Sequence, residues 1–301
     1  MPLTHTRTFR IRYYECDANG HLNSASYLRY MQETAFDASA AAGYGMDRYD
    51  QLQRHWLIRE SQVEFLIPLR YNQQVEVTTW IADFRRVTSR RAYEFRLAET
   101  GELAARASTD WVFLDTATNR PSSIPRSLVD DFFPEGAPSH FPARTPFPSS
   151  PPPPPGVFSM HRRVAWQDID SMQHVNNSVY MDYINECGFR VCSAFHWPWQ
   201  RMREQGFTIF LRQAHLQYLQ PAVLDDDLEI STWVSGVKRA SAGRHYTFRR
   251  AQDGVLLAQA YTLGVWVNLD TQQPLHIPQE MLNDFAPNIV YREEGGHYYR
   301  L

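Results

Sequence analysis

The sequence predicts an α+β chain in which one domain occurs twice, each time as a long buried helix wrapped by a curved antiparallel sheet. Three observations support this: an internal repeat at a constant offset of 153 residues, a proline-rich segment between the copies, and the same order of strand, helix and strands in each copy. A chain of 301 residues is long enough for two domains that each bury a core.

The repeat runs without a gap from Arg10 to Phe132, and each position aligns with the one 153 residues later, with many identical pairs. Around the first turn and helix the identical pairs are Asp17 with Asp170, His21 with His174, Asn23 with Asn176, Tyr27 with Tyr180, Tyr30 with Tyr183, Glu33 with Glu186 and Phe36 with Phe189. Chance does not produce an ungapped register of this length. We therefore predict one domain over residues 1–133 and a second over 157–301.

Residues 134–156, PEGAPSHFPARTPFPSSPPPPPG, form the predicted linker. Its prolines exclude helix and sheet and favour an extended polyproline segment. At about 3.1 Å per residue such a segment could span a domain face, so we expect the two copies to pack side by side.

The hydrophobic pattern predicts the same elements in each copy. Apolar alternation predicts a first strand at 8–16 and at 161–169. Asn23 and Asn176 are suitable N-caps for helices at 24–43 and 177–195, which are apolar on more than one face and are expected to be buried. The remaining predicted strands are 61–69, 74–84, 91–99 and 102–115 in the first copy, and 214–222, 227–237, 245–252 and 255–270 in the second.

Composition narrows the class of protein. Hydrophobic residues at 43% and charged residues at 21% are typical of a globular protein, and a net charge of −3 gives no overall field for nucleic acid. No run reaches the roughly 18 apolar residues of a membrane span, and no signal peptide is recognisable. The three cysteines lack metal-ligand spacing and are expected to be reduced thiols. We therefore expect a cytoplasmic protein without a metal or redox cofactor.

One short stretch gathers polar side chains at the boundary between the first strand and the helix. It reads YYECDANGHLN at 13–23 and recurs as WQDIDSMQHVN at 166–176. Carboxylates placed before a helix N-terminus, where free backbone N–H groups and the positive end of the dipole lie, suit chemistry at a polarised carbonyl.

These motifs resemble those of the hotdog-fold acyl thioesterases, and the resemblance covers both copies. Residues 168–180 read D-x-D-x-x-x-H-V-N-N-x-x-Y, and 15–27 give a looser version. The family implies two hotdog domains that form an internal pseudo-dimer and hydrolyse acyl-CoA or acyl-carrier-protein thioesters. In the 4-hydroxybenzoyl-CoA thioesterase-like branch the first carboxylate is catalytic, which implies Glu15 and Asp168 as base or nucleophile.

The acyl-carrier-protein branch has the pattern D-x-N-x-H instead. In the first copy it falls on Asp17, Asn19 and His21. The second copy keeps Asp170 and His174 but has Met172 in place of the asparagine. In this branch the histidine would orient water or a carboxylate, and the asparagine would be a polar partner in the first copy only.

Each candidate also has a purely structural interpretation. The four acidic residues could cap the helix or brace the turn, and the two histidines could be buried, hydrogen-bonded side chains. Cys16 invites a Cys-His interpretation, but Ile169 holds its place in the other copy, which favours a small apolar strand residue. Glu33 and Glu186 are the second choice of base, with a buried glutamate braced by Arg59 or Arg212 as the plainer alternative.

Basic residues cluster at one predicted hairpin in each copy. In hotdog CoA enzymes such residues meet the nucleotide phosphates, and guanidinium groups suit phosphate oxygens. A solvated turn is an equally good interpretation. The candidates are Arg85, Arg86, Arg90 and Arg91 in the first copy, and Lys238, Arg239 and Arg244 in the second.

Two other functions stay open. A hotdog hydratase or dehydratase would also use Asp and His, but there the His follows the Asp by five positions rather than four. A non-enzymatic acyl-CoA sensor would need an effector domain, for which no segment is left. The acyl chain, the carrier, the active copy and any further dimerisation of the chain are not indicated by the sequence.

Overall fold

The computed structural model describes residues 1–138, 140–141, 143–294 and 297–300. The chain divides into two compact units, Met1–Pro146 and Phe147–Leu301, and the division lies inside the predicted linker. The described residues of 134–156 contain no helix or strand, as the prolines predict. No helix in the described ranges combines the length and apolar character needed to cross a membrane.

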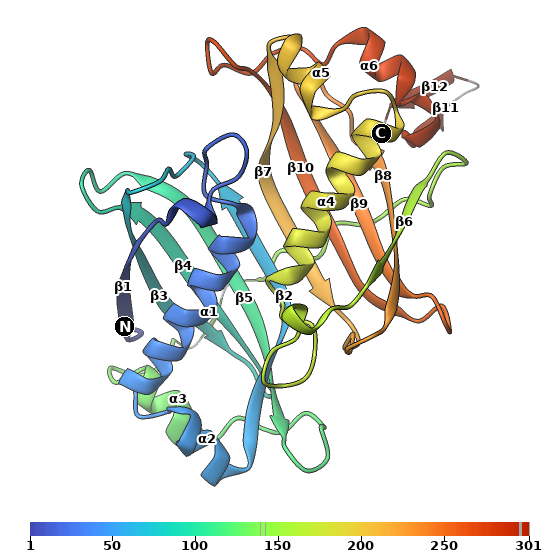
Figure 1. Cartoon of the computed structure of the whole chain (residues 1–301). Coiled ribbons are helices and arrows are strands. Elements are labelled where there is room, and N and C mark those ends of the chain that lie inside the picture. The colour runs from blue at the N-terminus through green and yellow to red at the C-terminus, as the bar shows by residue number, and fades with distance from the viewer. Residues whose placement is uncertain (139, 142, 295–296, 301) are drawn as a thin grey trace. The chain divides into compact units, whose positions relative to one another are not determined.

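The first unit places one long helix against an antiparallel sheet (Figure 1). The strands are hydrogen-bonded in the order β1-β3-β4-β5-β2. In chain order the elements are β1 (Thr4–Arg10), a 3₁₀ turn η1 (Tyr13–Glu15), α1 (Ser24–Ala41), α2 (Met46–Leu52), β2 (Arg54–Phe65), β3 (Gln74–Phe84), β4 (Thr88–Leu97), β5 (Leu103–Asp115) and α3 (Arg126–Phe132).

The second unit repeats this plan, with strands in the order β7-β10-β9-β8-β6. A short hairpin follows at its C-terminal end. The elements are β6 (Phe158–Arg163), η2 (Trp166–Asp168), α4 (Val179–Ala194), α5 (Trp199–Glu204), β7 (Phe207–Tyr218), β8 (Asp227–Ser235), β9 (Ser241–Arg250), β10 (Leu256–Asn268), α6 (Gln279–Asp284), η3 (Ala286–Asn288), β11 (Tyr291–Glu294) and β12 (His297–Arg300).

The predicted strands are found with shifted ends. The first strand of each copy ends earlier than predicted, at Arg10 and Arg163, because the residues that follow form the 3₁₀ turns η1 and η2. Asn23 caps α1 as predicted, since its Oδ1 accepts from the Ala25 amide at 2.9 Å. Asn176 is not the N-cap of α4; Ser178 holds that position, and the amide of Ser178 donates to Asn176 Oδ1.

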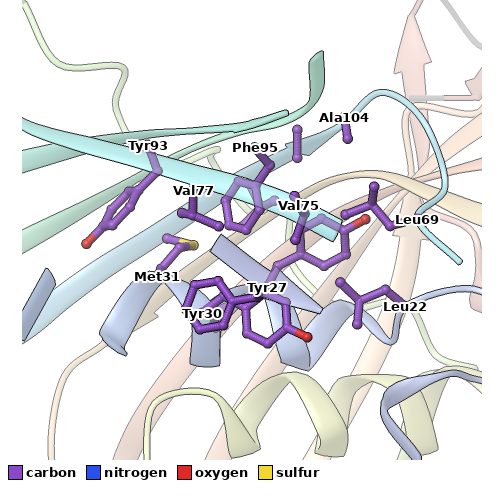
Figure 2. Packing of buried hydrophobic residues seen from close by; sticks show 14 of the residues in the cluster. Leu22, Tyr27, Tyr30, Met31, Leu69, Val75, Val77, Tyr93, Phe95 and Ala104 are labelled. Atoms are coloured by element: carbon purple, nitrogen blue, oxygen red, sulfur yellow. The ribbon is translucent and has the colours of Figure 1, made fainter. Parts of the chain in front are cut away.

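One face of α1 supplies the core of the first unit, as Figure 2 shows. The Tyr27 ring lies 5.0 Å from that of Phe65 and 5.2 Å from that of Phe95. The second unit repeats this cluster with Tyr180, whose ring lies 5.4 Å from that of Tyr218 and 5.3 Å from that of Phe248. The same aromatic contacts therefore hold helix to sheet in both units.

Neither long helix is buried on all sides, contrary to the prediction from its apolar composition. In α1 the side chains of Arg29, Glu33 and Phe36 are exposed, and in α4 the side chain of Phe189 is 47% exposed. Each helix covers the sheet with one stripe and leaves the opposite stripe open.

The face of the second sheet opposite α4 holds a buried histidine. His245 on β9 is only 2% exposed, its Nε2 lies 2.7 Å from Ser235 Oγ, and its ring lies 5.2 Å from that of Tyr261. Burial, with the nearby charge of Arg244, lowers the pKa of His245 to about 4. The ring is therefore neutral in the folded protein at physiological pH.

This histidine makes the chain sensitive to acid. Because the unfolded ring takes up a proton near pH 6.5 and the folded ring only near pH 4, the stability it supports is present above pH 6.5 and is lost as the pH falls towards 4. Between pH 6.5 and pH 4, the free energy of unfolding measured in urea should fall by about 3 kcal/mol more for wild type than for His245→Gln. Equal acid sensitivity of the two proteins would contradict this assignment.

Candidate active site

A tight turn joins η1 to helix α1 in the first unit. The Asp17 amide donates to the His21 carbonyl at 2.7 Å, and Asp17 Oδ1 accepts from the amides of Asn19 at 2.8 Å and His21 at 3.1 Å. Gly20 has φ of +76°, a left-handed conformation that glycine adopts without strain. Asp17 thus closes the turn with one carboxylate oxygen.

The second oxygen of Asp17 makes no hydrogen bond or ion pair with the described residues. The bonds that Oδ1 makes fix the orientation of the carboxylate and therefore the position of Oδ2. The side chain as a whole is half-buried. A carboxylate with one anchored and one free oxygen is preorganised to accept a proton or to orient water. The bracing role predicted for Asp17 is therefore found, and it leaves an oxygen for chemistry.

Asn19 and His21 complete the polar groups of this turn. The Oδ1 atom of Asn19 is buried and contacts no hydrogen-bond partner in the described part of the chain. His21 is 7% exposed, and burial, followed by the charge of Arg70, lowers its pKa. The imidazole is therefore neutral near pH 7 and able to accept a proton.

Glu15 has the contacts of its structural interpretation, that of a carboxylate that braces the turn. Its Oε2 accepts from the Arg12 amide at 2.8 Å and from the Tyr30 hydroxyl at 2.7 Å, which ties η1 to helix α1. Burial and the Glu15 carboxylate raise the pKa of Tyr30, so its hydroxyl stays protonated and donates. This is the geometry of a bracing carboxylate rather than of one free to attack a thioester.

Asp168 is held in the same way in the second unit. Its Oδ2 accepts from the Ala165 amide and from the Tyr183 hydroxyl, each at 2.8 Å, and its side chain is 8% exposed. Arg162 approaches the same oxygen at 3.8 Å. Both copies therefore use the first acid to brace the turn, and a tyrosine of the following helix completes the brace.

The turn of the second unit has the same backbone but different polar groups. Asp170 Oδ1 accepts from the Met172 amide and Oδ2 from Asn176 Nδ2, both at 3.0 Å, so both of its oxygens are engaged. Met172 is 43% exposed, and Gln173 has φ of +61° where the first copy has glycine. The Asp-Asn-His set is thus present in the first unit alone.

Ser26 is a buried polar residue near this turn that the motif did not indicate. It lies in the first turn of α1, is fully buried, and its Oγ has no partner among the described residues. An unsatisfied buried hydroxyl is uncommon and calls for an explanation. The sequence contained a signal for Ser26, because the matching residue of the second copy is the apolar Val179.

The other predicted candidates lie outside this turn or are engaged. Glu33 is exposed and pairs with Arg7 at 3.3 Å, so the expected buried glutamate is wrong for this residue. Glu186 pairs with Arg162 and Arg190 at the surface of α4. Burial and the nearby Asp17 raise the pKa of the Cys16 thiol, which disfavours a thiolate nucleophile.

The basic residues separate into exposed and engaged groups. Arg85, Arg86 and Lys238 are exposed at hairpin turns. Arg90 makes a two-pronged bond to Asp110 at 2.6 and 2.9 Å, Arg91 is buried under Phe132, and Arg239 bonds His276. Arg244 approaches Asn288 inside the second unit. Arg239 is exposed as well but is engaged by His276, so among the described candidates Arg85, Arg86 and Lys238 are the ones left to meet a phosphate.

Both copies are similar to family models of thioesterases. Residues 2–132 match the family model of the acyl-ACP thioesterase N-terminal domain, and residues 164–285 match that of the thioesterase-like superfamily. A chloroplastic acyl-[acyl-carrier-protein] hydrolase of Cuphea viscosissima is 28% identical over 193 residues, which cover 61% of this chain and 47% of that protein. The chain thus spans about half the length of this relative.

Solved structures share the fold. A Lactobacillus plantarum protein provisionally named an oleoyl thioesterase superposes with a TM-score of 0.76 over 88% of this chain and 96% of its own, at 17% identity. The 12:0-ACP thioesterase from Umbellularia californica gives 0.68 over 90% and 94%, at 21% identity. These structures establish a hotdog-type fold with an antiparallel sheet. Each copy of the repeat is therefore similar to a thioesterase family model, and the chain has the fold of these solved structures.

Proposed function

We propose that this protein hydrolyses acyl thioesters and that the turn at residues 17–21 of the first unit carries the chemistry. The observation that supports this is the combination of Asp17, Asn19 and His21 on one turn beside the N-terminus of α1. The relatives' names indicate acyl-carrier-protein thioesters as the first substrates to test. Coenzyme A thioesters are the second substrates to test. Their phosphates would contact the exposed side chains Arg85, Arg86 and Lys238.

Each group of the turn has a role in this proposal. Neutral His21 accepts a proton from water, and the free oxygen of Asp17 orients that water towards the thioester carbonyl. The side-chain amide of Asn19 and the positive end of the α1 dipole stabilise the oxyanion that develops. Departure of the thiol then leaves the free acid. Glu15 positions the turn through Tyr30 and does not touch the substrate.

In this proposal the second unit serves as a scaffold. Its Asp170 has both oxygens engaged and its turn lacks the asparagine. Pairing of the two units as an internal pseudo-dimer and a cytoplasmic location remain predictions.

Matched substitutions in the two turns test the assignment. Asp17→Asn should lower kcat by on the order of 10²- to 10⁴-fold, because it removes the group that orients water. Asp170→Asn, the same change in the second copy, should alter kcat by less than about threefold. Hydrolysis is measured on acyl-carrier-protein and acyl-CoA thioesters from octanoyl to octadecanoyl. Equal losses in the two variants, or hydration of an enoyl thioester without hydrolysis, would overturn the proposal.

The pH profile tests His21 separately. Because burial lowers the pKa of His21, the ring stays neutral until the pH falls below the ordinary histidine value, about 6.5. The acid limb of kcat/KM should therefore have its midpoint below about 6.5, and it should be unchanged in His174→Gln. A midpoint above that value, or a profile altered by the His174 substitution, would show that another group titrates.

A further inference from the structure

A groove runs between the edge strand β6 and helix α4 of the second unit. Figure 1 shows β6 at the edge of the sheet. The groove has a volume of about 520 Å³, which is within the usual range of ligand sites. It is open to solvent along its length and is lined by Phe158, Ser159, Met160, Phe189, Arg190 and Ser193.

In the first unit a charged side chain lies at the matching place between the edge strand and the long helix. Arg7, which matches Met160, lies between β1 and α1 and bonds Asp37 at 2.8 Å and Glu33 at 3.3 Å. Its guanidinium also covers the Phe9 ring at 4.8 Å. Asp37 matches Arg190, so the Arg7–Asp37 pair has no counterpart in the second unit, where Arg162 on β6 pairs instead with Glu186 on α4 at 3.3 Å.

The groove combines an apolar wall with one cation. Phe158, Met160 and Phe189 supply the wall. Arg190 is 61% exposed and pairs through Nε and Nη2 with Glu186, which leaves its Nη1 without a partner among the described residues. Glu186 also accepts from Arg162, so two guanidinium groups share this one carboxylate.

This chemistry selects an anion with an apolar tail. A carboxylate can accept from Arg190 Nη1 and add a negative charge beside two guanidinium groups. An unbranched hydrocarbon chain can lie on the rings of Phe158 and Phe189, which expose apolar surface to water, and can contact Met160, which is only 8% exposed.

We propose that the β6–α4 groove binds a free fatty-acid anion, with its chain against Phe158, Met160 and Phe189 and its carboxylate at Arg190. The groove lies on a different unit from the turn at residues 17–21, and its lining contains none of the groups assigned to hydrolysis. The proposal rests on the proposed function only for the source of the ligand, since hydrolysis of an acyl thioester releases a fatty acid.

The Met160 methyl group reports on the groove directly. In protein labelled with ¹³C at the methionine methyls, its resonance is identified by its loss in Met160→Leu. Titration of wild type with dodecanoate should shift this resonance saturably. Arg190→Gln should weaken dodecanoate binding by at least about fivefold and leave binding of 1-dodecanol unchanged, because the alcohol carries no charge.

The repeat supplies a matched variant that closes the groove. Met160→Arg with Arg190→Asp installs the ion pair of the first unit and should abolish binding at the groove, measured by displacement of a dansylated fatty acid. Folding is checked by the urea midpoint. A Met160 resonance that does not move, or binding unaffected by the double substitution, would overturn the proposal. Asp17→Asn should keep groove binding, so loss of hydrolysis and loss of this site are distinguished.

Discussion

The hydrogen bond from the Tyr30 hydroxyl to Glu15 Oε2 joins helix α1 to the turn before it, and the bond from Tyr183 to Asp168 does the same in the second unit. Each carboxylate also accepts from a backbone amide, so it fixes the 3₁₀ turn and the helix together. Hydrogen bonds to an ionised acceptor are about twice as strong as neutral ones, and removing one partner leaves a buried charge unsatisfied. The brace thus ties the start of the turn at residues 16–23 to the helix that follows it.

On this common scaffold the two copies have diverged at a few side chains. The first keeps an unengaged carboxylate oxygen, a buried asparagine oxygen and a buried neutral histidine on one turn. The second engages both oxygens of Asp170 and replaces the asparagine with an exposed methionine. The two copies also differ between the edge strand and the long helix. In the first copy Arg7 and Asp37 form an ion pair there, whereas the second copy has the β6–α4 groove. We infer that each unit has specialised one region of the same fold.

The sequence predicted the elements whose pattern is long and regular. β3 was predicted at 74–84, where it is found, and α1 was predicted to within two residues of its end. The four short helices were not predicted, since six or seven residues are too few for a helical period to be recognised. For Glu15 the sequence left a catalytic and a bracing role open, because a motif gives the spacing of a carboxylate but not the partner that it contacts. That partner, Tyr30, is fifteen residues away and lies beside the carboxylate only after α1 has folded.

The central claim is that the turn of the first copy, and not that of the second, meets the scissile thioester. Titration with a thioether analogue of the substrate, followed by NMR of ¹³C-labelled histidine rings, tests it most directly. The resonances of His21 should shift on binding while those of His174 stay in place. A shift of His174 with His21 unmoved would contradict the account and transfer the reaction to the second unit.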